Sequence, residues 1–274
     1  MSGLPAAAQA PLGRCLAEVL AVRELGVYRV ITVSDSGPAP APGQFAMLAA
    51  AERWGGGAGE RPFLARAFSV ARHESGRSEF LLEDVGPGTR RLCELGAGER
   101  LWLAGPFGRP FTAPQDGRRA ILVGGGVGIA PLAILQDELE RAGTPVTVLL
   151  GFRDGARVPG AELLRGAEVA TDDGSAGHHG LVTTLLEREL ARGQDAVVYA
   201  CGPAGMLEGV RAMCERAGVP AQLALESGMA CGYGACYGCV VPARGGGYLR
   251  VCVDGPVIDA ALLEHVEEHA GAHA

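Results

Sequence analysis

Residues 118–143 read RRAILVGGGVGIAPLAILQDELERAG, and this stretch decides how the middle of the chain folds. The apolar run 120–123 predicts a buried strand, four of the next five residues are glycine, and 130–141 has the spacing of an amphipathic helix. This order opens a parallel α/β unit. Further strand-like and helix-like segments alternate downstream, at 144–152, 167–173, 181–193, 195–203 and 204–218. We therefore expect a doubly wound parallel sheet.

The glycine turn of this stretch is a candidate nucleotide site. Its glycines are Gly124, Gly125, Gly126 and Gly128. Backbone amides at the start of a helix can bind an anion, although a tight crossover without a ligand would use the same residues. Binding is favoured by YACGP at 199–203, because Cys201, Gly202 and Pro203 end another expected strand. Nucleotides bind in the crevice beyond such strand ends.

Upstream of residue 111 the pattern changes to short alternating segments broken by Gly and Pro. These strand-like segments are 15–25, 27–34, 43–50, 66–72, 78–86 and 100–108, with one helix-like insert at 89–95. Closely spaced short strands of this kind predict a small antiparallel β-barrel.

Two polar motifs lie in the expected barrel. RAFS at 66–69 places Arg66 and Phe68 on one face of a strand, and GPGT at 86–89 opens the short helix. Arginine pairs with phosphate, and a helix start with a free hydroxyl, that of Thr89, can bind another phosphate oxygen. A strand with one solvated arginine is the alternative interpretation of RAFS.

Downstream of the sheet, the stretch CGYGACYGC at 231–239 is rich in cysteine and glycine. Its three cysteines and a later one have the spacing C-x4-C-x2-C, then C after twelve residues: Cys231, Cys236, Cys239 and Cys252. This is the ligand spacing of a plant-type [2Fe–2S] cluster, and small neighbours let the loop wrap closely around it.

Disulfides and zinc are the alternatives for these cysteines. Residues 1–12 lack the basic start and apolar core of a signal peptide, which favours a reducing cytosol and disfavours disulfides. Zinc usually takes paired CxxC spacings, which are absent here. The scattered cysteines are expected to be small buried apolar residues: Cys15, Cys93, Cys201 and Cys214.

Length and charge limit the remaining possibilities. A chain of 274 residues holds about two domains of ordinary size, and we divide it into 13–113, 114–221 and a small module at 222–274 that ends in a helix over 259–270. The net charge of −7 argues against nucleic acid binding. No apolar run reaches the ~18 residues of a membrane span.

In combination, these motifs resemble the ferredoxin reductase superfamily and, within it, the electron-transfer subunits of two-component NAD-dependent dihydroorotate dehydrogenases. The resemblance covers nearly the whole chain beyond residue 12. It rests on RAFS at 66–69, GPGT at 86–89, GGGVGIAPL at 124–132, TDDGS at 171–175, YACGP at 199–203, LESGMACGYGACYGCVV at 225–241 and RVCVDGPVID at 250–259.

The resemblance implies three redox groups: FAD in the barrel, NAD on the sheet and a [2Fe–2S] cluster on the four cysteines. It implies that Arg66 lies at the FAD phosphates, with Ser69 near the flavin ring and Phe68 beside it. The rest of the implied FAD site is Ala67, Leu82, Glu83, Asp84, Gly88 and Thr89. The family usually has proline after the arginine and an aliphatic residue before the serine, where this chain has Ala67 and Phe68.

The function implied by the resemblance is an electron relay in pyrimidine biosynthesis. Dihydroorotate would be oxidised at the FMN of a separate catalytic subunit, and electrons would pass through the cluster and FAD to NAD⁺. No catalytic acid or base is expected in this chain. A cytoplasmic dimer of heterodimers is implied, with docking expected near Tyr233 and Tyr237.

Two alternatives remain open at this stage. One is the flavin and iron–sulfur subunit of a related oxidoreductase, such as a sulfide dehydrogenase, a ferredoxin–NADP oxidoreductase or a hydrogenase complex. The other is a non-enzymatic binding module whose cluster senses redox state.

Overall fold

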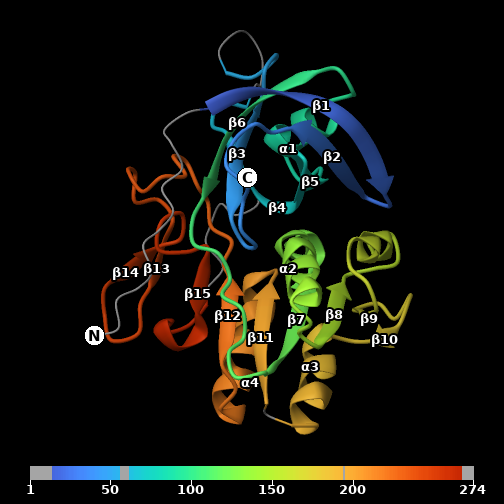
Figure 1. Cartoon of the computed structure of the whole chain (residues 1–274), viewed down its shortest axis with the longest axis vertical. Coiled ribbons are helices and arrows are strands. Elements are labelled where there is room, and N and C mark those ends of the chain that lie inside the picture. Colours follow the sequence, from blue (N-terminus) through green and yellow to red (C-terminus); the bar gives the residue numbers. More distant parts are fainter. Residues whose placement is uncertain (1–13, 56–61, 194, 267–274) are drawn as a thin grey trace.

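The computed structural model describes residues 14–55, 62–193 and 195–266. In Figure 1 a barrel lies above a helix-covered sheet, and a small C-terminal module lies along one side, next to β12 and β15. Three sequence predictions lie outside the described residues: the lack of a signal peptide over 1–12, the start of the first domain at 13, and positions 267–270 of the expected last helix. No helix within the described ranges is long and apolar enough to cross a membrane.

The first part is a closed antiparallel barrel, as the sequence predicts. Its strands are β1 (Arg14–Leu25), β2 (Tyr28–Ser34), β3 (Phe45–Ala50), β4 (Arg66–Glu74), β5 (Arg77–Glu83) and β6 (Arg100–Phe107), in the order β1-β2-β5-β4-β3-β6. Alternate apolar residues, such as Val19, Ile31 and Phe80, point inward and fill the interior. The helix α1 (Pro87–Cys93) begins at the GPGT motif.

The second part is a sheet in the order β10-β9-β8-β7-β11-β12-β15. Its strands are β7 (Arg119–Gly125), β8 (Val146–Phe152), β9 (Ala167–Thr171), β10 (His178–His179), β11 (Ala196–Cys201), β12 (Ala221–Ala224) and β15 (Val257–Asp259). All neighbouring pairs are parallel except β12 with β15. The predicted doubly wound parallel sheet is therefore confirmed, with one antiparallel edge strand added.

Helices cover both faces of this sheet. They are α2 (Ala130–Arg141), α3 (Val182–Ala191) and α4 (Ala204–Ala217). In β7, Ile121 and Val123 pack with residues of α3 and α4, whereas Leu122 packs with residues of α2 and the barrel. Because successive side chains of a strand point to opposite faces, the continuous apolar run of β7 fills two cores.

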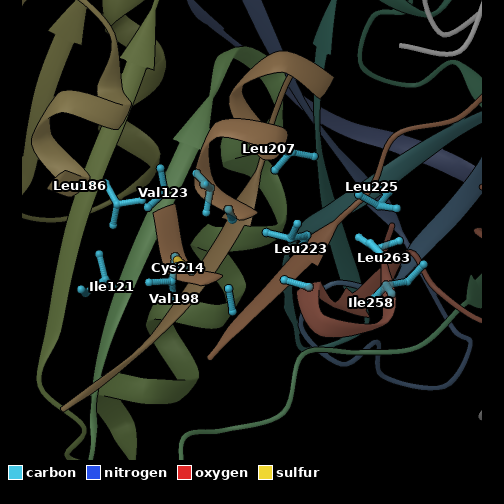
Figure 2. Packing of buried hydrophobic residues seen from close by; sticks show 14 of the residues in the cluster. Ile121, Val123, Leu186, Val198, Leu207, Cys214, Leu223, Leu225, Ile258 and Leu263 are labelled. Carbon is cyan, nitrogen blue, oxygen red and sulfur yellow. The ribbon is translucent and has the colours of Figure 1, made fainter. Parts of the chain in front are cut away.

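The C-terminal module carries the cysteine loop and the hairpin β13 (Val240–Pro242) and β14 (Tyr248–Arg250). It leaves the sheet after β12 and returns to it as β15, with Ile258 paired to Leu223. Figure 2 shows Ile258 and Leu263 beside Leu223 and Leu225, in the same buried cluster as α3 and α4. The module therefore shares a hydrophobic core with the sheet.

The helix predicted over 259–270 is wrong for its described part. Asp259 caps a single 3-10 turn, Ala260–Leu262, by accepting the amide of Ala261, and no helix follows up to residue 266. Leu263 is fully buried and forms a bridge to Ala243 instead. The backbone here pairs with the neighbouring hairpin, so contacts within the module override local helix propensity.

Candidate functional site

One cleft of about 940 Å³ opens where the barrel, the sheet and the start of the C-terminal module meet. The barrel contributes RAFS of β4 and the turn before α1. The sheet contributes the glycine turn after β7 and the ends of β8 and β11. The segment from Leu225 to Met229, which leads to the first cysteine of the loop, completes the lining. Segments far apart in sequence thus meet at one site of the size of a ligand pocket.

Arg66 on the barrel wall is held in a shaped space. Its Nη1 donates to the carbonyl of Leu64 at 2.6 Å. At Gly88 an added Cβ would lie 2.6 Å from Nε of Arg66, so only glycine leaves room for the guanidinium beside the start of α1. The arginine and the glycine of the two barrel motifs are thereby brought together.

The two faces of β4 pack against different parts of the protein. Phe68 packs against the barrel interior, whereas Ala67 packs against the core that includes the C-terminal module. Ser69 pairs with Phe45 of β3, and all residues of RAFS line the cleft. The expected alternation of the strand is present.

Of the other residues predicted to bind FAD, some line the cleft and some do not. Leu82 is fully buried in the barrel interior. Glu83 lines the cleft and forms an ion pair with Arg157 at 2.8 Å, which joins barrel to sheet. Asp84 pairs with Arg90 at 3.2 Å and does not line the cleft.

The hydroxyl of Thr89 is already engaged. It accepts the amides of Val85 and Gly86 at 2.9 and 3.0 Å and lies 3.0 Å from the carbonyl of Gly86. The residue lines the cleft, but its oxygen caps α1 and is not the free hydroxyl suggested by the sequence.

On the sheet wall, the glycine turn touches the end of β11. An added Cβ at Gly128 would lie 2.5 Å from the carbonyl carbon of Cys201 and the nitrogen of Gly202. Gly125, Gly126, Gly128, Cys201 and Pro203 line the cleft, whereas Gly124 and Gly202 do not. A Cβ at Gly124 would meet the core residues Ile129 and Leu150. Burial, with a smaller effect of Glu226, raises the pKa of the Cys201 thiol, so it stays neutral near pH 7.

Several lining residues were missed at the sequence level. Arg153 and Asp172 follow the neighbouring strands β8 and β9 at their carboxyl ends. The side chain of Asp172 has no hydrogen bond or ion pair within the described ranges, whereas Asp173 accepts the amide and hydroxyl of Ser175 at 2.9 and 2.6 Å. The sequence signal that could have identified both residues is a charged side chain directly after a parallel strand.

A further lining residue, Ser227, also points to a ligand. Its Oγ is buried and has no hydrogen-bond partner in the described part of the chain. A buried hydroxyl without a hydrogen-bond partner lowers stability by about 1–3 kcal/mol. Such a group in a cleft therefore indicates that a bound molecule or water forms the missing hydrogen bond. Together with the guanidinium of Arg66 in the cleft wall, this fits an anionic cofactor in the cleft.

The four candidate cluster ligands are arranged as two pairs. Sγ of Cys239 lies 3.2 Å from Sγ of Cys252, and the side chain of Cys236 is near enough to Cys231 to help lower its pKa. All eight cysteines are free, which excludes a disulfide in this structure. Within the described residues, no three His, Cys, Asp or Glu side chains are grouped around a position for one metal ion. Two pairs suit a cluster of two irons, each held by two thiolates, better than a single zinc ion.

Backbone amides favour the thiolate form in this loop. Burial opposes ionisation of Cys231, but the amides of Tyr233 and Cys236 outweigh it and lower its pKa to about 7. The contact with the Cys252 thiol, followed by amide groups, lowers the pKa of Cys239 to about 6, and the same contact raises the pKa of Cys252, so this pair shares one proton when no metal is bound. Iron is bound by thiolates, and amides directed at sulfur tune such clusters, so the donor set fits a [2Fe–2S] group.

Comparison with known proteins agrees with this geometry. Residues 226–264 match the family model of the iron–sulfur cluster binding domain of dihydroorotate dehydrogenase B. The electron transfer subunit of dihydroorotate dehydrogenase B (NAD(+)) from Caldanaerobacter subterraneus is 38% identical over 247 residues, covering 88% of this chain and 94% of that protein. Its counterpart from Geobacillus thermodenitrificans is 40% identical over 229 residues, covering 80% and 85%.

This chain belongs to the family of electron transfer subunits of NAD-dependent dihydroorotate dehydrogenase B. The membership confirms the predicted resemblance and the predicted function, that of an oxidoreductase subunit which transfers electrons. It also confirms, at the level of the family, the predicted redox groups FAD, [2Fe–2S] and NAD. The family name implies a partner that carries the catalytic step.

A solved structure shows how widely the architecture is shared. The NADH-dependent reduced ferredoxin–NADP oxidoreductase, described for flavin-based electron bifurcation, superposes with a TM-score of 0.77 at 26% identity, covering 97% of this chain and 91% of that one. It belongs to the class of the alternative oxidoreductases. The fold therefore does not distinguish these functions. The family model matched by residues 226–264 and the relatives at 36–40% identity do distinguish them.

Proposed function

We propose that the cleft holds FAD against the barrel and NAD against the sheet, while Cys231, Cys236, Cys239 and Cys252 hold the cluster. Arg66 would bind the FAD phosphates, with Ser69 and Phe68 at the ring. On the opposite wall, the amides of the glycine turn and the end of β11 at Cys201 would receive the nucleotide. The redox groups known for the family support this proposal, as do the position of Arg66 in the cleft wall beside Gly88 and the unpartnered Ser227.

One contact supports the proposed electron relay between the cluster and FAD. At Gly232, next to the first cysteine, an added Cβ would lie 2.8 Å from Cγ of Met47. Met47 is buried in β3 and pairs in register with Ala67, which lines the cleft. The cysteine loop and the cleft thus both border the strand pair β3–β4, which is the proximity that a relay needs.

The chain's own residues supply placement and environment. A bound flavin exchanges single electrons with a cluster and a hydride with a nicotinamide, which is why all three groups are needed. Burial and amide groups at the cysteines set the environment of the cluster. The Glu83–Arg157 ion pair at the cleft, and the hydrogen bond from Arg72 to the carbonyl of Leu163 at 2.7 Å, hold barrel and sheet together.

The direction and the partner are part of the proposal. Dihydroorotate would be oxidised on a separate FMN-containing catalytic subunit, and this chain would receive the electrons at its cysteine loop and deliver them to NAD⁺. A dimer of heterodimers is proposed for the assembly. Eight free cysteines support a reducing compartment, and we propose the cytoplasm.

The decisive experiment is to co-purify the chain with a candidate catalytic dehydrogenase from the same genome. We expect flavin and iron–sulfur absorbance bands, and NADH formation when dihydroorotate and NAD⁺ are added. The same bands without NADH would contradict the dihydroorotate relay and direct attention to sulfide or ferredoxin as electron donors. Absence of both bands would contradict the assigned sites.

A further inference from the structure

Of the three arginines that line the cleft, Arg66, Arg153 and Arg157, the first and the last differ in whether a carboxylate neutralises their charge. Arg157 lies between Glu83 and Asp154, at 2.8 and 2.6 Å, and is therefore neutralised by protein carboxylates. Within the described residues, no carboxylate forms an ion pair with Arg66. The guanidinium of Arg66 is accordingly the one of the two that keeps its full charge for an anionic ligand.

The uncharged ring of Trp54 lies near the Arg66 guanidinium. The guanidinium carbon of Arg66 lies 6.0 Å from the centre of the Trp54 ring, which is at the range of a cation–π contact. Gly88 leaves room for the same guanidinium, and the carbonyl of Leu64 accepts its Nη1. The ring and these backbone groups together restrict the position of the arginine.

The Trp54 ring is itself fixed by packing. It is partly buried against the interior cluster of the barrel. Its Nε1 is buried and has no hydrogen-bond partner in the described part of the chain, so no hydrogen bond there determines its orientation. The barrel core therefore holds the ring on one side, and Arg66 approaches it.

These contacts matter because an arginine side chain carries about 2 kcal/mol of rotamer entropy. A side chain that is ordered before the ligand arrives loses less on binding. A carboxylate would order it too, but would neutralise the charge that phosphate requires. An aromatic ring orders the guanidinium and leaves its N–H groups and its charge available.

We infer that Trp54 is a positioning residue of the FAD site, which holds the Arg66 guanidinium ready for the phosphates. This inference rests on the proposed contact between Arg66 and FAD. It assigns a function to a tryptophan outside every motif that carries the resemblance.

The test is a double-mutant cycle on the deflavinated protein, with FAD affinity measured by quenching of flavin fluorescence. We expect Trp54→Leu to raise the FAD Kd about 5- to 20-fold and Trp54→Phe, which keeps an aromatic ring, to stay within about 3-fold of the parent. Arg66→Ala should raise the Kd further. In the Arg66→Ala background, Trp54→Leu should have almost no additional effect, because the two residues act as one unit.

The controls separate the possible failures. Trp102, the other tryptophan, has Arg14 and not Arg66 over its ring, at 4.9 Å, so Trp102→Leu should leave the Kd unchanged. Trp54→Met replaces the ring by a flexible apolar side chain of similar reach and takes the place of the leucine variant if that one does not fold.

Each contrary outcome has a distinct meaning. An unchanged Kd in Arg66→Ala would overturn the proposed phosphate contact itself. If Arg66→Ala binds FAD more weakly but Trp54→Leu leaves the Kd unchanged, only the positioning function of Trp54 is overturned. The same holds if the two effects are fully additive in the double variant. A loss in Trp54→Phe equal to that in Trp54→Leu would also overturn it, because the ring would then not be the active feature.

Discussion

At the scale of single residues, Cys236 is the most accessible of the four proposed ligands and tests the cluster directly. It is exposed, and its sulfur accepts the amide of Gly238 at 3.4 Å. Cys236→Ser should remove or destabilise the cluster and stop electron flow, while FAD stays bound in the separate cleft. The measurement is the visible absorbance and the iron content. Cys93→Ser, which lies outside the loop, serves as control; equal iron content in the two variants would contradict the ligand assignment.

Gly128 tests the contact between the two strand ends proposed to bind the nucleotide. Gly128→Ala would place a Cβ about 2.5 Å from the backbone of Cys201 and Gly202, so the turn must move away from β11. We expect a loss of about 1–3 kcal/mol in the free energy of unfolding and weaker NAD binding. Gly205 also lines the cleft, but has open space around its Cα, so Gly205→Ala is the matched control and should not destabilise the protein. Denaturant unfolding of both variants checks the difference.

The residue scale also shows what sequence can predict. The cysteine spacing is a local property, because one loop supplies three ligands, and it indicated the cluster without a structure. The partner of Glu83 is Arg157, 74 positions away, and no local pattern encodes that pair. The hydroxyl of Thr89 was expected to be free, yet it caps its own helix. The chemistry of a local motif was therefore predictable. Whether a given polar side chain binds a ligand or another residue of the protein was not.

At the scale of elements, the periodicity of apolar residues was sufficient for the long strands and helices. All six barrel strands and the helices α2, α3 and α4 lie where the pattern placed them. The strands β12 and β15 were missed, since each has only three or four residues and carries too little pattern. They are nevertheless the elements that attach the cysteine module to the sheet. The proposed domain boundary at 221/222 falls at this attachment, within β12, and stays a prediction.

The strand β15 offers a test of that attachment. Ile258 is 3% exposed and lies in the core shared by sheet and module. Ile258→Ala should lower the free energy of unfolding by about 2–5 kcal/mol, because it leaves a cavity in this core. Leu262, in the following turn, is 44% exposed, and Leu262→Ala should cost far less. Equal losses by thermal or denaturant unfolding would show that β15 does not hold the module in solution.

At the scale of the whole molecule, the site exists only where three parts of the chain meet. The barrel supplies Arg66, the sheet supplies strand ends, and the module places its cysteine loop against Met47, which pairs with the cleft residue Ala67. Sequence reasoning predicted each part and its cofactor separately. It did not predict that Leu225–Met229 would line the cleft, because that follows from the path of the chain between β12 and the cysteines.

The partner should dock at the outer side of the cysteine module. Three of the five tyrosines of the chain, Tyr233, Tyr237 and Tyr248, are 55%, 63% and 72% exposed and all belong to this module. Exposed tyrosines are enriched at protein interfaces. Because Tyr248 lies in β14 and not between the cysteines, Tyr248→Ala should leave the absorbance spectrum unchanged. It should weaken association with the catalytic subunit about 10- to 100-fold, the effect of an aromatic interface residue.

Leu16 of β1 is an exposed apolar residue on the barrel, and Leu16→Ala is the matched control for this docking surface. Titration of the catalytic subunit against each variant gives the association constant. NADH formation at saturating partner should recover in Tyr248→Ala, because the relay inside the chain is intact and only docking is weakened. A variant that binds normally but transfers electrons slowly would place Tyr248 on the electron route and contradict a docking role. If Leu16→Ala alone weakened association, the catalytic subunit would have to bind the barrel, and the cysteine loop would then need a different electron donor.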